Sequence, residues 1–201
     1  ASFVRALNID GIDGVECDVR YSKDKKLVIA HDDNLAFRGH RYKNVSKMDA
    51  EQLASAEYSI PTLKSVFKIF ENNIEKKIVI DYKTQDDTFK AIKQVEALVA
   101  QYNCNITHLV WQDNYDFVLK YEPRHPVYFA PGGNNSRYID CDALQRNGYT
   151  GVSLNYDDRR IDRVLEFEYL MVNLYGPHSQ RTAMLEQSAR DPSRFSITVD
   201  V

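Results

Sequence analysis

Hydrophobic residues recur along this chain with two different spacings. In short segments apolar and polar side chains alternate, and in the longer segments between them apolar side chains recur every three or four positions. Alternate side chains share a face of a strand, whereas recurrence at three and four positions marks one face of a helix. The alternation predicts strands over residues 14–20, 27–32, 77–83, 107–112, 127–130, 151–155, 170–175 and 196–201.

The helical periods fall between these strands. They predict helices over residues 2–8, 46–53, 60–70, 87–102, 115–120, 139–147, 158–168 and 179–190. We expect Ser46 to cap the helix that runs through Leu53, with Asp49 placed for a capping box. Residues 33–43 are polar and without a period, and they contain Gly39, so a loop is predicted there.

Alternating strands and helices predict parallel βα units. In several strands the polar residues occupy alternate positions and so share one face. Their side chains would point toward a shared interior while helices cover the apolar faces. This arrangement favours a closed (β/α)8 TIM barrel over an open sheet. About seven barrel strands are present in residues 1–201, which we expect to form one domain, and the first strand of the barrel is the one missing.

The strand predicted over residues 14–20 carries two carboxylates on one face. Glu16 and Asp18 point one way, and the other parity is apolar. Two like charges taken out of water either shift a pKa or require a cation, and a hard divalent metal is the simplest one. Asp81 and Lys83 repeat the pattern on a later strand, where the alternative is a salt bridge inside the barrel. His31 ends the strand over residues 27–32 and supplies a group that titrates near neutral pH.

The other histidines have weaker signals. His40 follows a loop rather than a strand, and we expect it to be a solvated loop residue. His108 and His125 have no companion motif, and a surface role is expected for both.

Composition excludes several classes of function. Hydrophobic residues make up 43% and charged residues 27% of 201, typical of a globular protein, and the longest apolar runs fall short of a membrane span. A net charge of -3 without a basic cluster argues against nucleic acid as a partner. Three cysteines without metal spacing fit free thiols in a reducing compartment such as the cytoplasm, although one bridge plus one free thiol is also compatible. A signal peptide upstream of Ala1 would be invisible here, so localisation stays open.

The carboxylate and histidine motifs resemble those of the glycerophosphodiester phosphodiesterase family. Its hallmark is Gly-x-Asp-Gly-x-Glu-x-Asp-Val, a short turn, and an apolar strand that ends in His-Asp. In this chain the hallmark reads Gly11-Ile12-Asp13-Gly14-Val15-Glu16-Cys17-Asp18-Val19, followed by Ile29-Ala30-His31-Asp32. Pro61-Thr62-Leu63 before a helix and Asp81-Tyr82-Lys83, where the family usually has Glu-x-Lys, extend the resemblance.

The resemblance implies a phosphodiesterase-type TIM barrel and a role for each motif residue. It implies that Mg²⁺ or Ca²⁺ is bound by Glu16, Asp18 and Asp81, with His31 as acid or base and Lys83 on the substrate phosphate. Tyr175 stands where the family has a tryptophan that lines the substrate pocket, and Asp200 fits the family's closing Thr-Asp. The family's first catalytic histidine, in a His-Arg-Gly strand, has no counterpart in these residues. We therefore expect an N-terminal piece to be lacking, or to have been lost in a divergent or proteolysed form.

The implied activity is hydrolysis of small glycerophosphodiesters to an alcohol and glycerol 3-phosphate, a reaction of lipid and glycerol metabolism. A lysophospholipase D activity on lysolipids is the alternative within the enzyme class. The rival from another class is a non-catalytic barrel that serves as a binding or regulatory module, which the absent His-Arg-Gly favours and the retained acidic set opposes. The sequence leaves the leaving alcohol, the choice of metal and the oligomeric state open.

Overall fold

The structure of the protein is a computed structural model that describes residues 2–36, 39–84, 88–111, 121–131, 140–155, 170–173 and 195–198. The chain forms two compact units, residues 1–107 and residues 108–201, and each is described by itself. No described helix has the length and the apolar character needed to cross a lipid bilayer. All three cysteines are free thiols, as the sequence predicted.

The first unit is built on a three-stranded arrangement with β1 in the middle. Strand β1 (Gly14–Tyr21) pairs in parallel with β5 (Lys77–Tyr82) and antiparallel with β2 (Leu27–Ile29). The two strands β1 and β5 lie so close at their start that a Cβ on Gly14 would be 2.2 Å from the carbonyl oxygen of Lys77. Only glycine fits there without moving the backbone.

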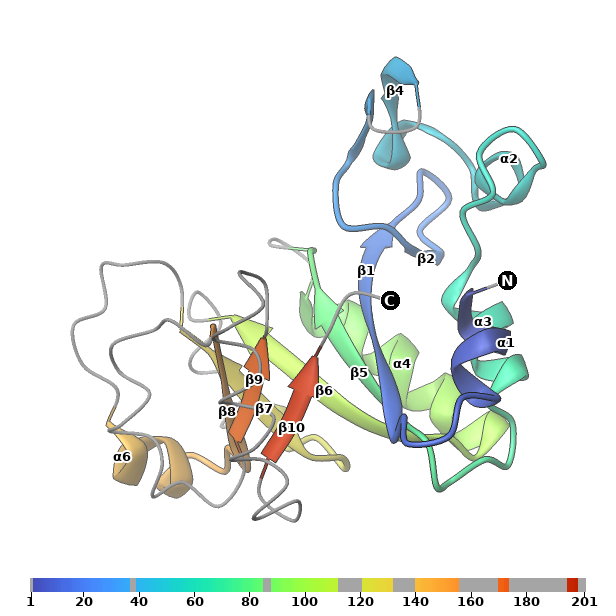
Figure 1. Ribbon diagram of the computed structural model, residues 1–201. Coiled ribbons are helices and arrows are strands. Elements are labelled where there is room, and N and C mark those ends of the chain that lie inside the picture. The colour runs from blue at the N-terminus through green and yellow to red at the C-terminus, as the bar shows by residue number, and fades with distance from the viewer. Residues whose placement is uncertain are drawn as a thin grey trace. The chain divides into compact units, whose positions relative to one another are not determined.

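Helices cover the apolar face of these strands. They are α1 (Ser2–Leu7), α3 (Leu63–Ile69) and α4 (Thr88–Tyr102), and Figure 1 shows α1 and α3 together beside β1. Helix α3 begins at Leu63, three residues after the predicted start, because the Thr62 hydroxyl accepts the Ser65 N–H at 3.1 Å and so caps the first turn. The largest fully buried side chains of the unit include Leu63, Phe67, Phe70, Ile78, Ile80 and Ile92.

Residues 33–53 differ from the prediction. The expected loop contains a two-stranded antiparallel hairpin, β3 (Asn34–Leu35) and β4 (His40–Asn44), which Figure 1 shows beyond the carboxyl end of β1. The expected single helix is a 3-10 turn, η2 (Val45–Lys47), followed by helix α2 (Ala50–Ala54). Asp49, not Ser46, is the N-cap of α2, and the Gln52 side chain accepts the Asp49 N–H at 3.0 Å. The Ser46 side chain is instead bonded to Asp33.

The second unit continues the parallel strand pattern. Strand β6 (Asn105–Trp111) leads into it and pairs with β7 (Val127–Ala130), followed in order by β8 (Gly151–Asn155), β9 (Leu170–Asn173) and β10 (Phe195–Thr198). The pairs β6/β7, β7/β8, β8/β9 and β9/β10 are all parallel. Helix α6 (Cys141–Arg146) precedes β8, and its N-cap Asp140 accepts the Ala143 N–H at 2.8 Å.

The predicted strands are thus confirmed as strands: those over residues 127–130 and 151–155 have the predicted bounds, and within the described residues the ends of the others differ by at most three residues. The helices predicted over residues 115–120, 158–168 and 179–190 lie outside the described residues. The organisation of residues 1–201 as one domain, and the absence of a first barrel strand, stay predictions.

Candidate active site

Three carboxylates converge on one face of the β1/β5 pair. In the parallel register Asp18 is the neighbour of Asp81, and Glu16 lies two positions earlier on the same face of β1. Oxygen atoms of Glu16, Asp18 and Asp81 all lie within 4.8 Å of one another. Asp81 is buried and the other two are half-buried. The structure therefore brings together the three residues that the sequence predicted as metal ligands.

Lys83 supplies the positive charge of this cluster. Its Nζ lies 2.8 Å from Asp81 Oδ2 and 3.2 Å from Asp18 Oδ1, and its side chain is 15% exposed. Burial alone would lower the pKa of Lys83, but the carboxylates of Asp81 and Asp18 outweigh it and raise that pKa above its ordinary value of 10.5. Lys83 is therefore a permanent cation at neutral pH. The salt bridge between Lys83 and Asp81, which was the predicted alternative, is present, and it also includes Asp18.

The donor set fits a divalent cation. Three carboxylates against one ammonium group leave two negative charges unbalanced, as a divalent ion would require. Carboxylate oxygens are the ligands that Mg²⁺ and Ca²⁺ prefer, and the mutual distances allow one ion to contact all three side chains. Residues Glu16, Asp18 and Asp81 could thus hold the ion while Lys83 stays beside it.

The opposite face of β1 is apolar and closed. Cys17 and Val19 are buried at 3% and 0% exposure. Burial first, and then the charges of Glu16, Asp18 and Asp81, raise the pKa of the Cys17 thiol well above its ordinary value. The thiol therefore stays protonated and serves as an apolar core group. The carboxylates of Glu16 and Asp18 therefore lie on a strand whose opposite face is buried in the apolar core, and this burial holds β1 in place.

His31 lies just after β2 and is tied to β1 by its backbone. The Ala30 N–H donates to the Asp18 carbonyl at 3.0 Å, and Arg20 Nε donates to the His31 carbonyl at 2.8 Å. The imidazole itself is 66% exposed, and its Nδ1 lies 2.9 Å from Asp32 Oδ1. The structure thus positions the His31 backbone next to the strand of the carboxylates, but it does not gather the imidazole into their cluster. Tyr175 and Asp200 lie outside the described residues.

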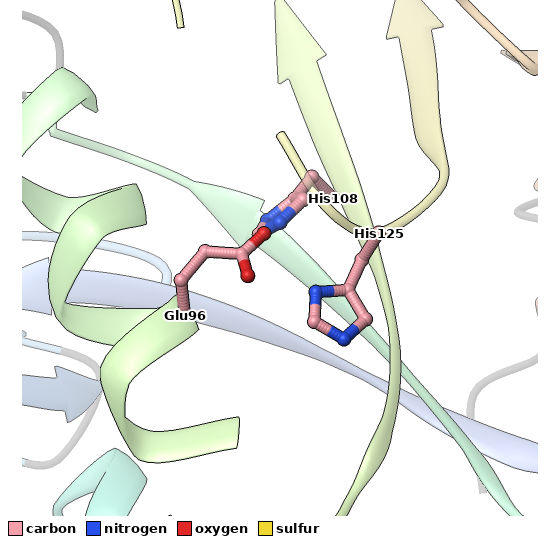
Figure 2. Close-up of side chains that lie close together, drawn as sticks. All are labelled: Glu96, His108 and His125. Carbon is pink, nitrogen blue, oxygen red and sulfur yellow. The ribbon is translucent and has the colours of Figure 1, made fainter. Parts of the chain in front are cut away.

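Two further histidines meet in the second unit, and one of them corrects a prediction. His108 lies on β6 with 0% exposure, so the expected surface role was wrong for it. Its ring centroid lies 6.2 Å from that of His125, with an interplanar angle of 74°. The backbone N–H of His108 donates to the Pro126 carbonyl at 2.8 Å. Figure 2 shows the imidazoles of His108 and His125. Strand β6 is buried on both faces, as parallel strands covered on both sides are, so a polar residue within it is buried too.

His40 also differs from its predicted role as a solvated loop residue. It begins β4, and its ring centroid lies 4.7 Å from that of Tyr58. Its Nδ1 is 3.8 Å from a carboxylate oxygen of Glu57, and its side chain is 27% exposed. His40 therefore packs against the segment that follows helix α2.

Solved structures share this fold. A glycerophosphodiester phosphodiesterase from Thermotoga maritima is 18% identical and superimposes with a TM-score of 0.76, covering 97% of this chain and 85% of that one. A phosphodiesterase from Oleispira antarctica, solved with its product sn-glycerol 3-phosphate, is 14% identical with a TM-score of 0.73, covering 97% of this chain and 83% of that one. These likenesses show that the α/β fold is that of glycerophosphodiester phosphodiesterase TIM barrels.

A curated human protein is similar in sequence. Lysophospholipase D GDPD1 is 34% identical over 139 residues, which are 60% of this chain and 42% of that protein, so the chain spans about two fifths of its length. Residues 1–183 match the glycerophosphoryl diester phosphodiesterase family. This match covers both the strands with the carboxylates and most of the second unit. The chain therefore belongs to the glycerophosphoryl diester phosphodiesterase family.

Proposed function

We propose that this protein is a metal-dependent phosphodiesterase that hydrolyses glycerophosphodiesters to an alcohol and glycerol 3-phosphate. The observation that carries the proposal is the convergence of Glu16, Asp18 and Asp81, with Lys83 among them, on one face of two parallel strands. The sn-glycerol 3-phosphate bound as product in the Oleispira antarctica relative supports the choice of substrate class.

The carboxylates would hold Mg²⁺ or Ca²⁺, and such an ion supplies Lewis-acid polarisation of a phosphoryl oxygen. Lys83 has a second role in this proposal. Its Nζ is already beside two carboxylates, and its raised pKa keeps it charged. When a phosphate group enters, the ammonium can donate to a phosphoryl oxygen and stabilise the charge that develops there. Lys83 then acts as a cation and not as a base.

His31 would move the proton. Phosphodiester hydrolysis needs a group that activates the nucleophile or protonates the leaving alcohol, and an imidazole suits this work near neutral pH. Because Nδ1 of His31 is bonded to Asp32, Nε2 is the ring atom left to exchange a proton with the substrate. The ring is exposed, so a substrate can reach it.

Lysophospholipase D activity on lysolipids is the second candidate function. The 34% identity with the human lysophospholipase D favours it, and so does the open position of His31. In the same active site, the two reactions differ in the group esterified to the glycerol phosphate and not in the bond type. The metal ligands and His31 therefore have the same roles in both.

The test measures release of glycerol 3-phosphate from glycerophosphocholine, and of choline from lysophosphatidylcholine, with Mg²⁺, Ca²⁺ or EDTA. It uses the 201-residue chain and a form in which a His-Arg-Gly strand of the family is added before Ala1. His31→Ala should lower kcat by about 10²- to 10⁴-fold, as expected for loss of an acid-base group. His125→Ala, in the other unit, is the matched control and should retain activity.

Metal binding is measured separately by calorimetry, so that it does not depend on turnover. Asp81→Asn should weaken the binding of Mg²⁺ or Ca²⁺, and His31→Ala should not. A folded, metal-binding chain that is inert on both substrates in both forms would overturn the enzymatic proposal and favour a non-catalytic barrel.

A further inference from the structure

The face of β1 and β5 that carries the carboxylates also carries two neighbouring cations. Arg20 follows Asp18 by two positions on β1, and Lys83 follows Asp81 by two positions, directly after β5. The register pairs Asp18 with Asp81, and the Lys83 N–H donates to the Val19 carbonyl at 3.0 Å, so the parallel pairing continues past the two acids. Arg20 and Lys83 are therefore register neighbours on the face of the candidate metal site.

Arg20 is held by the backbone of the segment that carries the proposed acid-base residue. Its Nε donates to the His31 carbonyl at 2.8 Å, and the residue is half-buried. The preceding residue of that segment, Ala30, donates its N–H to the Asp18 carbonyl at 3.0 Å. The guanidinium therefore lies beside the part of β1 that carries Asp18. This contact uses only one of the N–H donors of a guanidinium group.

The Nη groups of Arg20 carry the remaining donors. Within the residues that the structure describes, Arg20 forms no ion pair with a carboxylate. Asp18 lies 3.2 Å from Lys83 instead, and Asp32 Oδ1 lies 2.9 Å from Nδ1 of His31. The structure thus fixes the guanidinium through a neutral carbonyl group, without an acid that neutralises its charge.

Two cations at neighbouring positions of a sheet repel each other, and an anion that contacts both relieves this repulsion. With a divalent ion on the three carboxylates, the cluster that includes Lys83 is electrically neutral. A phosphodiester brings one further negative charge, and Asp32 lies close by, so the phosphate requires a cation in direct contact. Arg20 supplies it, because a guanidinium can donate parallel N–H bonds to two phosphate oxygen atoms.

We propose that Arg20 binds the phosphate group of the substrate, with its Nε on the His31 carbonyl and its Nη groups on phosphoryl oxygen atoms. The inference rests on the proposed function, because it assigns a further residue to the same site. Lys83 would contact the phosphate from the side of β5, and Arg20 would contact it from the side of β1. One guanidinium would thus join the phosphate to the backbone of His31 and place the phosphodiester next to the residue that moves the proton.

The expected effects follow from the chemistry of the side chain. Arg20→Met keeps an apolar stem but removes every donor, and it should weaken binding of sn-glycerol 3-phosphate by about 10- to 100-fold. Arg20→Lys keeps the charge but lacks the planar fork, so it cannot reproduce both contacts and should lose about tenfold. Arg20→Met should bind Mg²⁺ at least as tightly as the wild type, because loss of a nearby positive charge does not weaken binding of a cation.

Isothermal titration calorimetry tests the proposal without turnover. The 201-residue chain, saturated with Mg²⁺, is titrated with sn-glycerol 3-phosphate for wild type, Arg20→Met and Arg20→Lys. The matched control is Arg5→Met on α1, which changes an exposed arginine of the same unit in the same way and should bind like the wild type. The Mg²⁺ affinity of each variant is measured first, and circular dichroism verifies that each variant folds.

The Arg20 variants should lose affinity for sn-glycerol 3-phosphate and keep their affinity for Mg²⁺. Wild-type affinity in either Arg20 variant, an equal loss in Arg5→Met, or no binding by the wild type would overturn the inference. Loss of Mg²⁺ binding in Arg20→Met would also overturn it, because Arg20 would then support the carboxylate strand and not the phosphate. Hydrolysis of glycerophosphocholine separates the two proposals. Binding that needs Arg20 without hydrolysis contradicts only the enzymatic function, and hydrolysis with full binding by Arg20→Met contradicts only the role of Arg20.

Discussion

Removal of Lys83 should destabilise the first unit. Lys83→Met keeps the length of the side chain but leaves Asp81, with 7% of its side chain exposed, and Asp18 without their cation. At 2.8 Å and an effective dielectric constant of about 20, the Lys83–Asp81 attraction is about 6 kcal/mol before desolvation. Desolvation offsets much of this, and breaking buried pairs costs about 3–5 kcal/mol. Because Asp18 and Lys83 keep 22% and 15% exposure, we expect the low end, about 3 kcal/mol.

Urea unfolding of the metal-free chain measures this loss. The pKa of Lys83 is raised in the folded state, so its stabilisation is fully present below its ordinary pKa of 10.5 and is lost as the pH rises through the folded value. The difference in unfolding free energy between wild type and Lys83→Met should therefore be constant up to about pH 10 and shrink above it. Lys64→Met on α3, an exposed position, is the control and should change stability by less than about 0.5 kcal/mol. A Lys83→Met variant as stable as this control would refute the reasoning.

Three other predictions follow from the first unit. Gly14→Ala should lower the unfolding free energy by about 1–3 kcal/mol, because its Cβ would lie 2.2 Å from the Lys77 carbonyl oxygen; a loss under about 0.5 kcal/mol in urea would contradict the strand spacing. Hydrogen bonds from Ser22 and Lys26 lower the pKa of Asp24, so its stabilisation is present above its ordinary pKa of 3.8 and lost as the pH falls; Asp24→Asn should abolish that acid-side loss in a pH series of thermal unfolding. Cys17 should resist a thiol reagent in the native chain while the half-buried Cys141 reacts, and equal labelling rates would argue against the raised pKa of Cys17.

The carboxylate cluster could be predicted because it depends on parity and topology alone. Glu16 and Asp18 share a face of β1 by alternation, and Asp81 lies on the polar face of β5, the strand that follows helix α3. A parallel neighbour of β1 then brings Asp18 beside Asp81 without any further information. Cys17 and Ile80 lie on the opposite face and are buried. A shift of the strand pairing by one residue would expose these side chains to water, so the observed register is favoured.

The hairpin and His108 could not be predicted because their causes lie in tertiary structure. Strand β3 has two residues, too few for a visible period, and the hairpin depends on burial of Leu35 and on the Asp33–Ser46 hydrogen bonds. His108 lies in a strand that is buried on both faces, where polarity no longer reports which side chains meet water. For both the hairpin and His108, the local sequence pattern and the long-range packing favour different structures, and the packing determines which structure forms.

Two backbone contacts close the base of the segment that lies between β2 and α3, and this closure has an evolutionary consequence. The Ile29 N–H donates to the Pro61 carbonyl at 2.9 Å, and Val28 and Thr62 form an antiparallel bridge, so the chain returns to the point from which it left. The residues between these contacts, including the β3–β4 hairpin, form a segment whose two ends lie side by side. Insertions or exchanges within it can leave the pairing of β1 with β5, and thus the carboxylates, undisturbed. Descendants of such a chain that keep His31, which lies within this segment, can acquire new surfaces for new substrates while they keep the same carboxylate cluster.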